Sequence, residues 1–150
     1  MKSCGKKLCE EYMGKHPVIS ISLKGINAAS YEAAFELTVK TIKGAVQKAG
    51  FLKMSDKLDE DEKKEYRAIL DENMSEATLF WSLKNLSELL EKHYETKVIL
   101  LIDEYDVPLA KAFENGYYDK MVFLIRNLLE QTLKTNNSLK FAVMTGCMRI

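Results

Sequence analysis

The sequence contains few of the residues that cross-link a chain or interrupt regular structure. Its 150 residues include three cysteines, two prolines and seven glycines. An odd and sparse set of cysteines cannot form the disulfide framework of a small secreted protein. Proline and glycine contents this low exclude a collagen-like or low-complexity chain. We therefore expect a folded protein with ordinary packed thiols, located in the cytoplasm.

Cys4, Cys9 and His16 are three potential zinc ligands near the amino terminus. Structural zinc sites normally use paired ligands at characteristic spacings along the chain. Here the spacing matches no usual pairing, and no second pair follows. The sequence therefore favours packed thiols over a zinc site.

The sequence has neither an excess of charge of one sign nor a long apolar run. Its 22 basic residues balance its 22 acidic residues, so the formal net charge is zero. A protein that binds the phosphate backbone needs a basic excess, and we expect no direct nucleic-acid binding. The longest aliphatic run, residues 98–102, is far shorter than the ~20 residues that cross a bilayer. The amino terminus leads into no apolar signal core, so we expect no membrane span and no secretion.

Length and composition predict one domain over residues 1–150. A single core usually holds roughly 100 to 200 residues, and 47% apolar with 29% charged residues is a globular composition. Three segments predict β-strands, namely residues 18–23, 98–102 and 141–144. The second is a continuous apolar run, which is typical of a strand buried on both faces of a parallel sheet.

Apolar residues at helical spacing predict amphipathic helices between these strands. Ser30 and Ser75 supply side-chain oxygens that can cap two of them, and Asp59 with Glu62 has the form of a capping box rather than an acidic metal cluster. The predicted helices cover residues 3–13, 31–49, 60–70, 76–94 and 118–133. Strands separated by helices predict an α/β fold, here a three-layer αβα domain with a short parallel sheet and a helical insertion between the first two strands.

Acidic residues follow the buried strand directly, as Asp103, Glu104 and Asp106. In open α/β sheets ligands bind at the carboxyl ends of the strands. An apolar strand followed by Asp-Glu is the Walker B pattern of P-loop ATPases. In that chemistry Asp103 would hold Mg²⁺ through water, and Glu104 would orient or deprotonate the water that attacks the γ-phosphate. The alternative is a strand that simply ends at a polar turn.

Thr145 and Gly146 follow the third predicted strand. A threonine hydroxyl at a strand end can hydrogen-bond the γ-phosphate or the attacking water, although it can also satisfy its own turn. If the first role is right, the side chains of Thr145 and Asp103 should lie within one water-bridged contact, on the order of 4 to 7 Å. Arg149 follows four residues after Thr145 and is either a phosphate ligand or a solvated terminal residue.

Three segments together resemble the bacterial AAA-ATPase-like family: residues 15–25, 98–109 and 141–146. The signature Asp-Glu-Tyr-Asp-x-Pro-Leu after the apolar strand is specific, and the resemblance covers nearly the whole chain. It implies a P-loop ATPase that uses Mg²⁺ and ATP, with Asp103 as metal ligand, Asp103 and Asp106 in cofactor binding, and Glu104 and Thr145 in catalysis. Longer members of the family often carry a restriction-endonuclease-like domain as well.

Several elements of the family pattern are missing from these residues. No G-x-x-x-x-G-K-S/T motif is present, and Gly5-Lys6-Lys7 lacks the hydroxyl residue and a preceding strand. The later strand and the helical lid of the family are missing too. We therefore expect a partial P-loop core without the Walker A strand and loop or the carboxyl-terminal lid. Such a free chain would not bind or hydrolyse ATP appreciably.

Two other functions are compatible with the residues. The first is a non-catalytic protein-interaction module in which the acidic site is vestigial. The second is a metal-dependent phosphodiesterase that uses Asp103, Glu104 and Asp106 as a metal cluster, although no activating lysine follows at the usual spacing.

The resemblance also predicts an open sheet edge. In the resembled fold the strand that carries the phosphate-binding loop lies beside the strand that ends at Thr145. Without that neighbour, Phe141 and Val143 lie on an apolar edge strand, and such edges recruit another strand. We expect self-association or a partner through this edge, or a rearranged element of the same chain that covers it.

Overall fold

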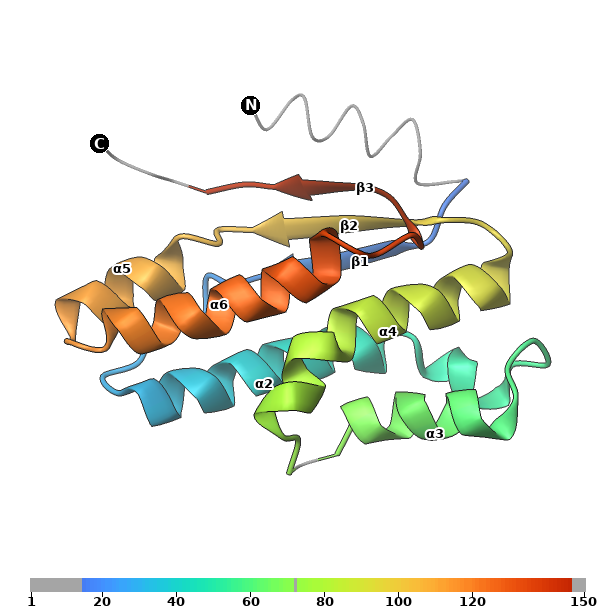
Figure 1. The fold of residues 1–150 in the computed structure, drawn as a ribbon, viewed down its shortest axis with the longest axis horizontal. Coiled ribbons are helices and arrows are strands. Elements are labelled where there is room, and N and C mark those ends of the chain that lie inside the picture. The colour runs from blue at the N-terminus through green and yellow to red at the C-terminus, as the bar shows by residue number, and fades with distance from the viewer. Residues whose placement is uncertain (1–14, 72, 147–150) are drawn as a thin grey trace.

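A computed structural model of the protein describes residues 15–71 and 73–146. It contains a parallel sheet of three strands, β1 (Val18–Ser22), β2 (Val98–Asp103) and β3 (Leu139–Met144), in the spatial order β1-β2-β3 (Figure 1). The register pairs Ser22 with Asp103 and Ile102 with Met144. The carboxyl ends of all three strands therefore meet at one end of the sheet.

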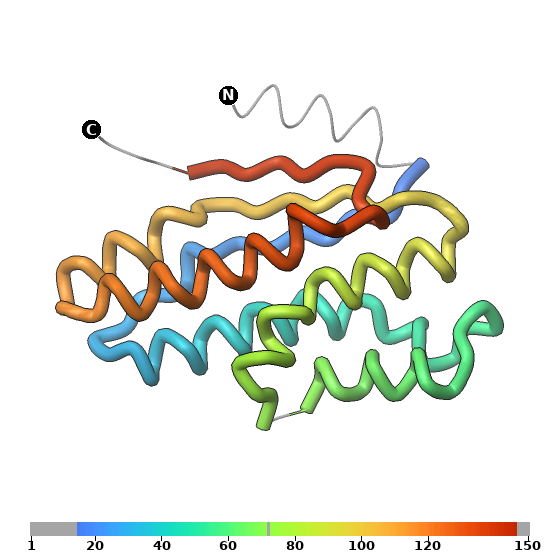
Figure 2. The backbone as a smooth tube through the Cα atoms, in the orientation of Figure 1, coloured from blue at the N-terminus to red at the C-terminus, as the bar shows by residue number. Residues whose placement is uncertain are grey.

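The helices lie in the two connections between these strands. The first connection holds α2 (Tyr31–Gln47), the short 3-10 helix η1 (Gly50–Met54), α3 (Glu60–Ile69) and α4 (Glu76–Tyr94), and the second holds α5 (Val107–Glu114) and α6 (Tyr118–Leu133). Because both crossovers join neighbouring parallel strands in the same direction, their helices lie on the same side of the sheet (Figure 2). The predicted α/β fold with a helical insertion between the first two strands is confirmed. It is consistent with a three-layer αβα architecture in which these helices form the layer on one face.

Local capping fixes where three of the helices begin. The Ser30 hydroxyl accepts a hydrogen bond from the Ala33 N–H at 3.3 Å, and Ser75 caps α4 in the same way. At α3 the Asp59 carboxylate accepts from the Glu62 N–H at 2.8 Å, while the Glu62 carboxylate accepts from the Asp59 N–H at 3.0 Å. The first of these bonds lowers the pKa of the Asp59 carboxyl. The predicted caps and capping box are therefore confirmed.

The core lies between the sheet and the helices. Alternate strand residues such as Ile19, Ile21 and Leu100 point into it and meet buried leucines of α4 and α6. Tyr66 of α3 is fully buried beneath this layer, and its hydroxyl donates to the Val46 carbonyl at 2.7 Å. Burial raises the pKa of the Tyr66 hydroxyl. This contact ties α3, the outermost helix, to α2.

The structure differs from the sequence prediction at a few element boundaries. Helix α5 was not predicted, and α2 ends at Gln47, earlier than the predicted end at residue 49. The predicted helix over residues 3–13 and the residues Cys4, Cys9 and Arg149 lie outside the described residues. Among the helices that are described, none has the length and apolar character required to span a bilayer.

Candidate functional site

The candidate site is the turn between β2 and α5. Strand β2 ends at Asp103, and α5 begins at Val107 with Pro108 in its first turn. The Val107 N–H donates to the Glu104 carbonyl at 3.2 Å, which closes the turn. On the other side, the Leu23 N–H donates to the Asp103 carbonyl at 2.9 Å. The backbone of the acidic turn is therefore held both by its own helix and by the end of β1.

Thr145 lies directly beside Asp103. Its N–H donates to the Ile102 carbonyl at 2.9 Å, and its carbonyl accepts from the Tyr105 N–H at 3.2 Å. Its hydroxyl donates to a carboxylate oxygen of Asp103. The predicted juxtaposition of the two strand ends is confirmed, but the expected separation of 4 to 7 Å was too long. The β2–β3 ladder continues one residue past β3 and brings the two side chains into direct contact.

Glu104 has a left-handed backbone conformation, with φ of 53°. A side chain on the α-carbon makes this conformation costly, by about 1 to 2 kcal/mol. Strained residues of this kind concentrate at functional sites, where the rest of the fold holds them in place. Glu104 is a half-buried residue directly after Asp103.

Gly146 completes the site beside Asp106 and Tyr105. A β-carbon at Gly146 would lie 2.9 Å from an Asp106 carboxylate oxygen and 3.0 Å from a ring carbon of Tyr105. These two side chains therefore pack against the backbone just after Thr145. Sequence reasoning did not assign Tyr105 or Gly146 to the site. The available signal was their position in the sequence, because Tyr105 lies between Glu104 and Asp106 and Gly146 follows Thr145.

The charge and chemistry of the site suit a hard cation only in part. Within the described residues, Asp103 and Glu104 form no ion pair, so their negative charge is not neutralised by a side chain. Mg²⁺ is usually held by one or two carboxylates together with water and substrate phosphates. The described part of the chain contains no group of three acidic, histidine or cysteine side chains that could hold a metal. The oxygen donors thus fit Mg²⁺ accompanied by phosphate, and the predicted alternative of a three-carboxylate phosphodiesterase is disfavoured.

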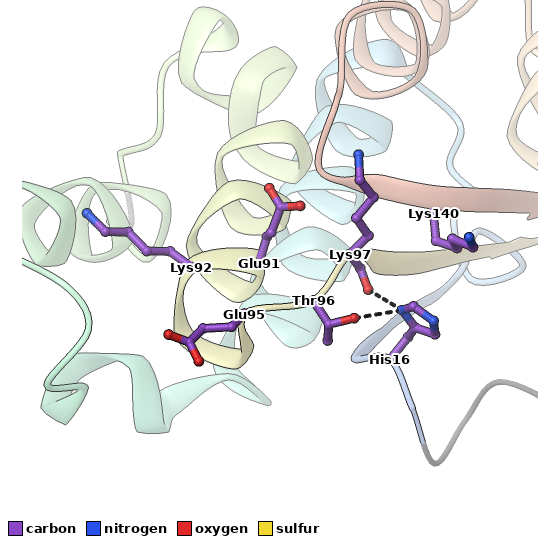
Figure 3. A pocket seen from close by; sticks show the side chains of 7 residues that line it. All are labelled: His16, Glu91, Lys92, Glu95, Thr96, Lys97 and Lys140. Carbon is purple, nitrogen blue, oxygen red and sulfur yellow. Dashed lines mark hydrogen bonds between the residues drawn. The ribbon is translucent and has the colours of Figure 1, made fainter.

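A cavity lies at the other end of the sheet. It has a volume of about 640 Å³ and is lined by residues around the starts of β2 and β3, including Lys97 and Lys140 (Figure 3). His16 borders it, and the Nδ1 atom of its ring lies 2.8 Å from the Lys97 carbonyl oxygen. Asp103 and Thr145 occupy the carboxyl ends of these strands. This cavity is therefore not part of the acidic site.

A family model named AAA-ATPase-like, with the description "Predicted AAA-ATPase", matches residues 5–150. Neither the search of curated proteins nor the search of solved structures found a match.

Proposed function

The chain belongs to the AAA-ATPase-like family of predicted AAA-ATPases, and we propose that it forms the part of an ATPase core that senses and activates Mg-ATP for hydrolysis. The observation that carries this proposal is the hydrogen bond from the Thr145 hydroxyl to the Asp103 carboxylate at adjacent strand ends. In P-loop ATPases a Walker B carboxylate holds Mg²⁺ beside the γ-phosphate, and a hydroxyl at the neighbouring strand end can hydrogen-bond that phosphate or the attacking water.

Each residue has a definite task in this proposal. Asp103 would hold Mg²⁺ through water, and Asp106 would contribute to cofactor binding from the start of α5. Glu104 would accept a proton from the attacking water. The Thr145 hydroxyl would either keep its hydrogen bond to Asp103 and orient that water through its oxygen, or turn to donate to the γ-phosphate instead. Bound Mg-ATP would supply the phosphoryl group and neutralise its developing charge. The strained backbone of Glu104 supports its role, because a merely structural turn would be formed at lower cost by glycine.

The test requires the phosphate-binding segment that these residues lack. The chain is extended at its amino terminus by the strand, loop and helix of a complete family member, and phosphate release from Mg-ATP is measured. We expect Glu104→Gln to lower the rate by at least about a hundredfold, since general-base catalysis typically contributes ~10²- to 10⁴-fold.

Glu95→Gln is the matched control, because Glu95 is the other glutamate with a left-handed backbone and lies at the end of α4. It should leave the rate unchanged, and both variants should bind ATP as the parent does. Full activity in Glu104→Gln would contradict the assignment.

A second candidate function is a non-catalytic interaction module. It is favoured by the absence of a phosphate-binding loop motif from the 150 residues and by the presence of a cavity of about 640 Å³ at the end of the sheet away from the acidic turn. Both candidates predict that the 150-residue chain shows no tight Mg-ATP binding by calorimetry. They separate in the extended protein, which should hydrolyse ATP only if the first is right.

A further inference from the structure

Strand β1 forms the edge of the sheet opposite β3 (Figure 1). It pairs only with β2 among the described strands. The Pro17 carbonyl accepts from the Ile99 N–H at 2.9 Å, and the Leu23 N–H donates to the Asp103 carbonyl at 2.9 Å. Because alternate residues of a strand face a given neighbour, the odd-numbered residues of β1 bond to β2. The N–H and carbonyl groups of Val18, Ser20 and Ser22 therefore point outward.

The side chains of β1 leave this outward edge accessible. Ser20 and Ser22 are exposed and small, and Val18 is half-buried. The strand contains no proline or lysine within residues 18–22, which are the residues that commonly protect an edge. A row of unpaired backbone groups is a template for another extended chain.

An apolar cavity of about 140 Å³ opens beside this edge. Its inner wall is formed by buried side chains of β1 and α4, Ile19 and Leu90 among them. Phe51 and Tyr94 also line it, with their ring centroids 5.7 Å apart in an edge-to-face pair, and they are 41% and 49% exposed. The cavity has the size to take one aliphatic side chain. Large exposed aromatic rings at its border are typical of a recognition site.

Lys48 gives the cavity a charge preference. It lines the cavity from the end of α2, it is exposed, and it makes no ion pair with any described residue. A carboxylate on a bound segment would be its complement. In an extended chain, residues two positions apart point to the same side, so the acidic residue would lie two positions from the aliphatic one.

We propose that the β1 edge binds an extended segment of a partner protein by strand addition. The segment pairs its backbone with Val18, Ser20 and Ser22, places an aliphatic side chain in the cavity beside Phe51 and Tyr94, and places a carboxylate near Lys48. The proposal does not depend on the ATPase assignment, because it involves the outward backbone groups of β1, whereas the ATPase assignment involves side chains at the ends of β2 and β3.

The test is a titration of the ¹⁵N-labelled chain with the peptide acetyl-Ser-Thr-Asp-Val-Leu-Val-Thr-Ser-amide, followed by NMR. We expect amide shifts centred on Val18, Ser20, Ser22 and Lys48. Two further peptides carry methyl groups on alternate backbone nitrogens. In one peptide the nitrogens of Asp and Leu are methylated, and in the other the nitrogens of the two Val residues are methylated. Only the one whose methyl groups face β1 should lose binding, because strand addition uses alternate N–H groups.

A charge-reversal pair tests the acidic preference. Lys48→Glu should weaken binding by roughly fivefold, near the upper limit for an exposed ion pair, and a peptide with Lys in place of Asp should restore it. Lys40→Glu, an exposed position on the same helix, is the matched control and should change nothing. The proposal is overturned if both methylated peptides bind equally, if the shifts centre on β3, or if the β1 shifts grow with protein concentration alone, which would identify a second copy as the occupant.

Discussion

Glu104 holds a backbone conformation that glycine adopts at lower cost, and so does Glu95. Their φ angles are 53° and 58°. Glu95 ends α4, a place where a left-handed residue commonly terminates a helix, and its carboxylate pairs with Lys57 at 2.9 Å. Glu104 has no such explanation, because no described ion pair and no helix end requires a glutamate there. The two residues therefore share a left-handed backbone, but only Glu95 has a structural reason for it in a helix end and an ion pair.

Replacing either glutamate by glycine should relieve the strain. We expect Glu104→Gly and Glu95→Gly each to raise the free energy of unfolding by on the order of 1 kcal/mol, less at Glu95 because its ion pair with Lys57 is lost. Urea denaturation of the two variants and the parent measures this. A loss of stability in Glu104→Gly would show that its side chain is structural, and would weaken the argument that strain marks function there.

At the scale of elements, α3 is held to the rest of the fold by a buried tyrosine. The Tyr66 hydroxyl donates to the Val46 carbonyl, which also accepts from the Ala49 N–H at 3.0 Å. Removing the hydroxyl therefore leaves that carbonyl satisfied. The loss is one buried hydrogen bond rather than an orphaned polar group.

Tyr66→Phe should lower the free energy of unfolding by about 1 kcal/mol near neutral pH. Its effect should also depend on pH. Because burial raises the pKa of Tyr66 above its ordinary value of 10.0, the folded state resists ionisation. The stability that this resistance contributes is fully present below the pKa of Tyr66 in the unfolded chain. It is lost as the pH rises through the pKa of Tyr66 in the folded chain.

Urea midpoints measured from neutral to strongly alkaline pH test this prediction. The parent should lose stability above about pH 10, and Tyr66→Phe should lose less. Tyr118→Phe is the control, since Tyr118 is 43% exposed. An equal alkaline loss in Tyr66→Phe and the parent would mean that other groups cause it.

At the scale of the whole molecule, β3 is the second open edge. Among the described strands it pairs with β2 alone, and its residues are mostly half-buried rather than covered. Val143 contributes an apolar side chain to this edge, and Lys140 is the strand's exposed cation. Residues 141–144 contain neither proline nor lysine, so this part of the edge favours pairing with another strand, whereas Lys140 protects only the start of β3.

We predict that the 150-residue chain self-associates through β3. The mass measured by light scattering should rise with protein concentration, and Val143→Lys should reduce this rise because a charge would be brought into the new interface. Ser20→Lys on the β1 edge is the control and should leave the mass unchanged. A chain that stays monomeric at high concentration would contradict the prediction.

Local sequence determined most of the elements. The caps at Ser30, Asp59 and Ser75 lie where the sequence indicates, because a cap depends on residues within one turn of each other. The apolar run of β2 is likewise recognisable without its neighbours. Helix α5 was missed because it has only eight residues and follows the acidic turn closely, which leaves too few residues to show a helical period.

The order and register of the strands were decided only in three dimensions. The sequence places Asp103 and Thr145 at strand ends that are 42 residues apart. Their direct contact depends on β3 lying next to β2, and on the Thr145 N–H reaching the Ile102 carbonyl. The left-handed backbone of Glu104 and the cavity beside β1 also arise from contacts between distant segments. Sequence patterns carry the residue types and their periodicity, whereas the packing of the sheet on α2, α4 and α6 sets which of them meet.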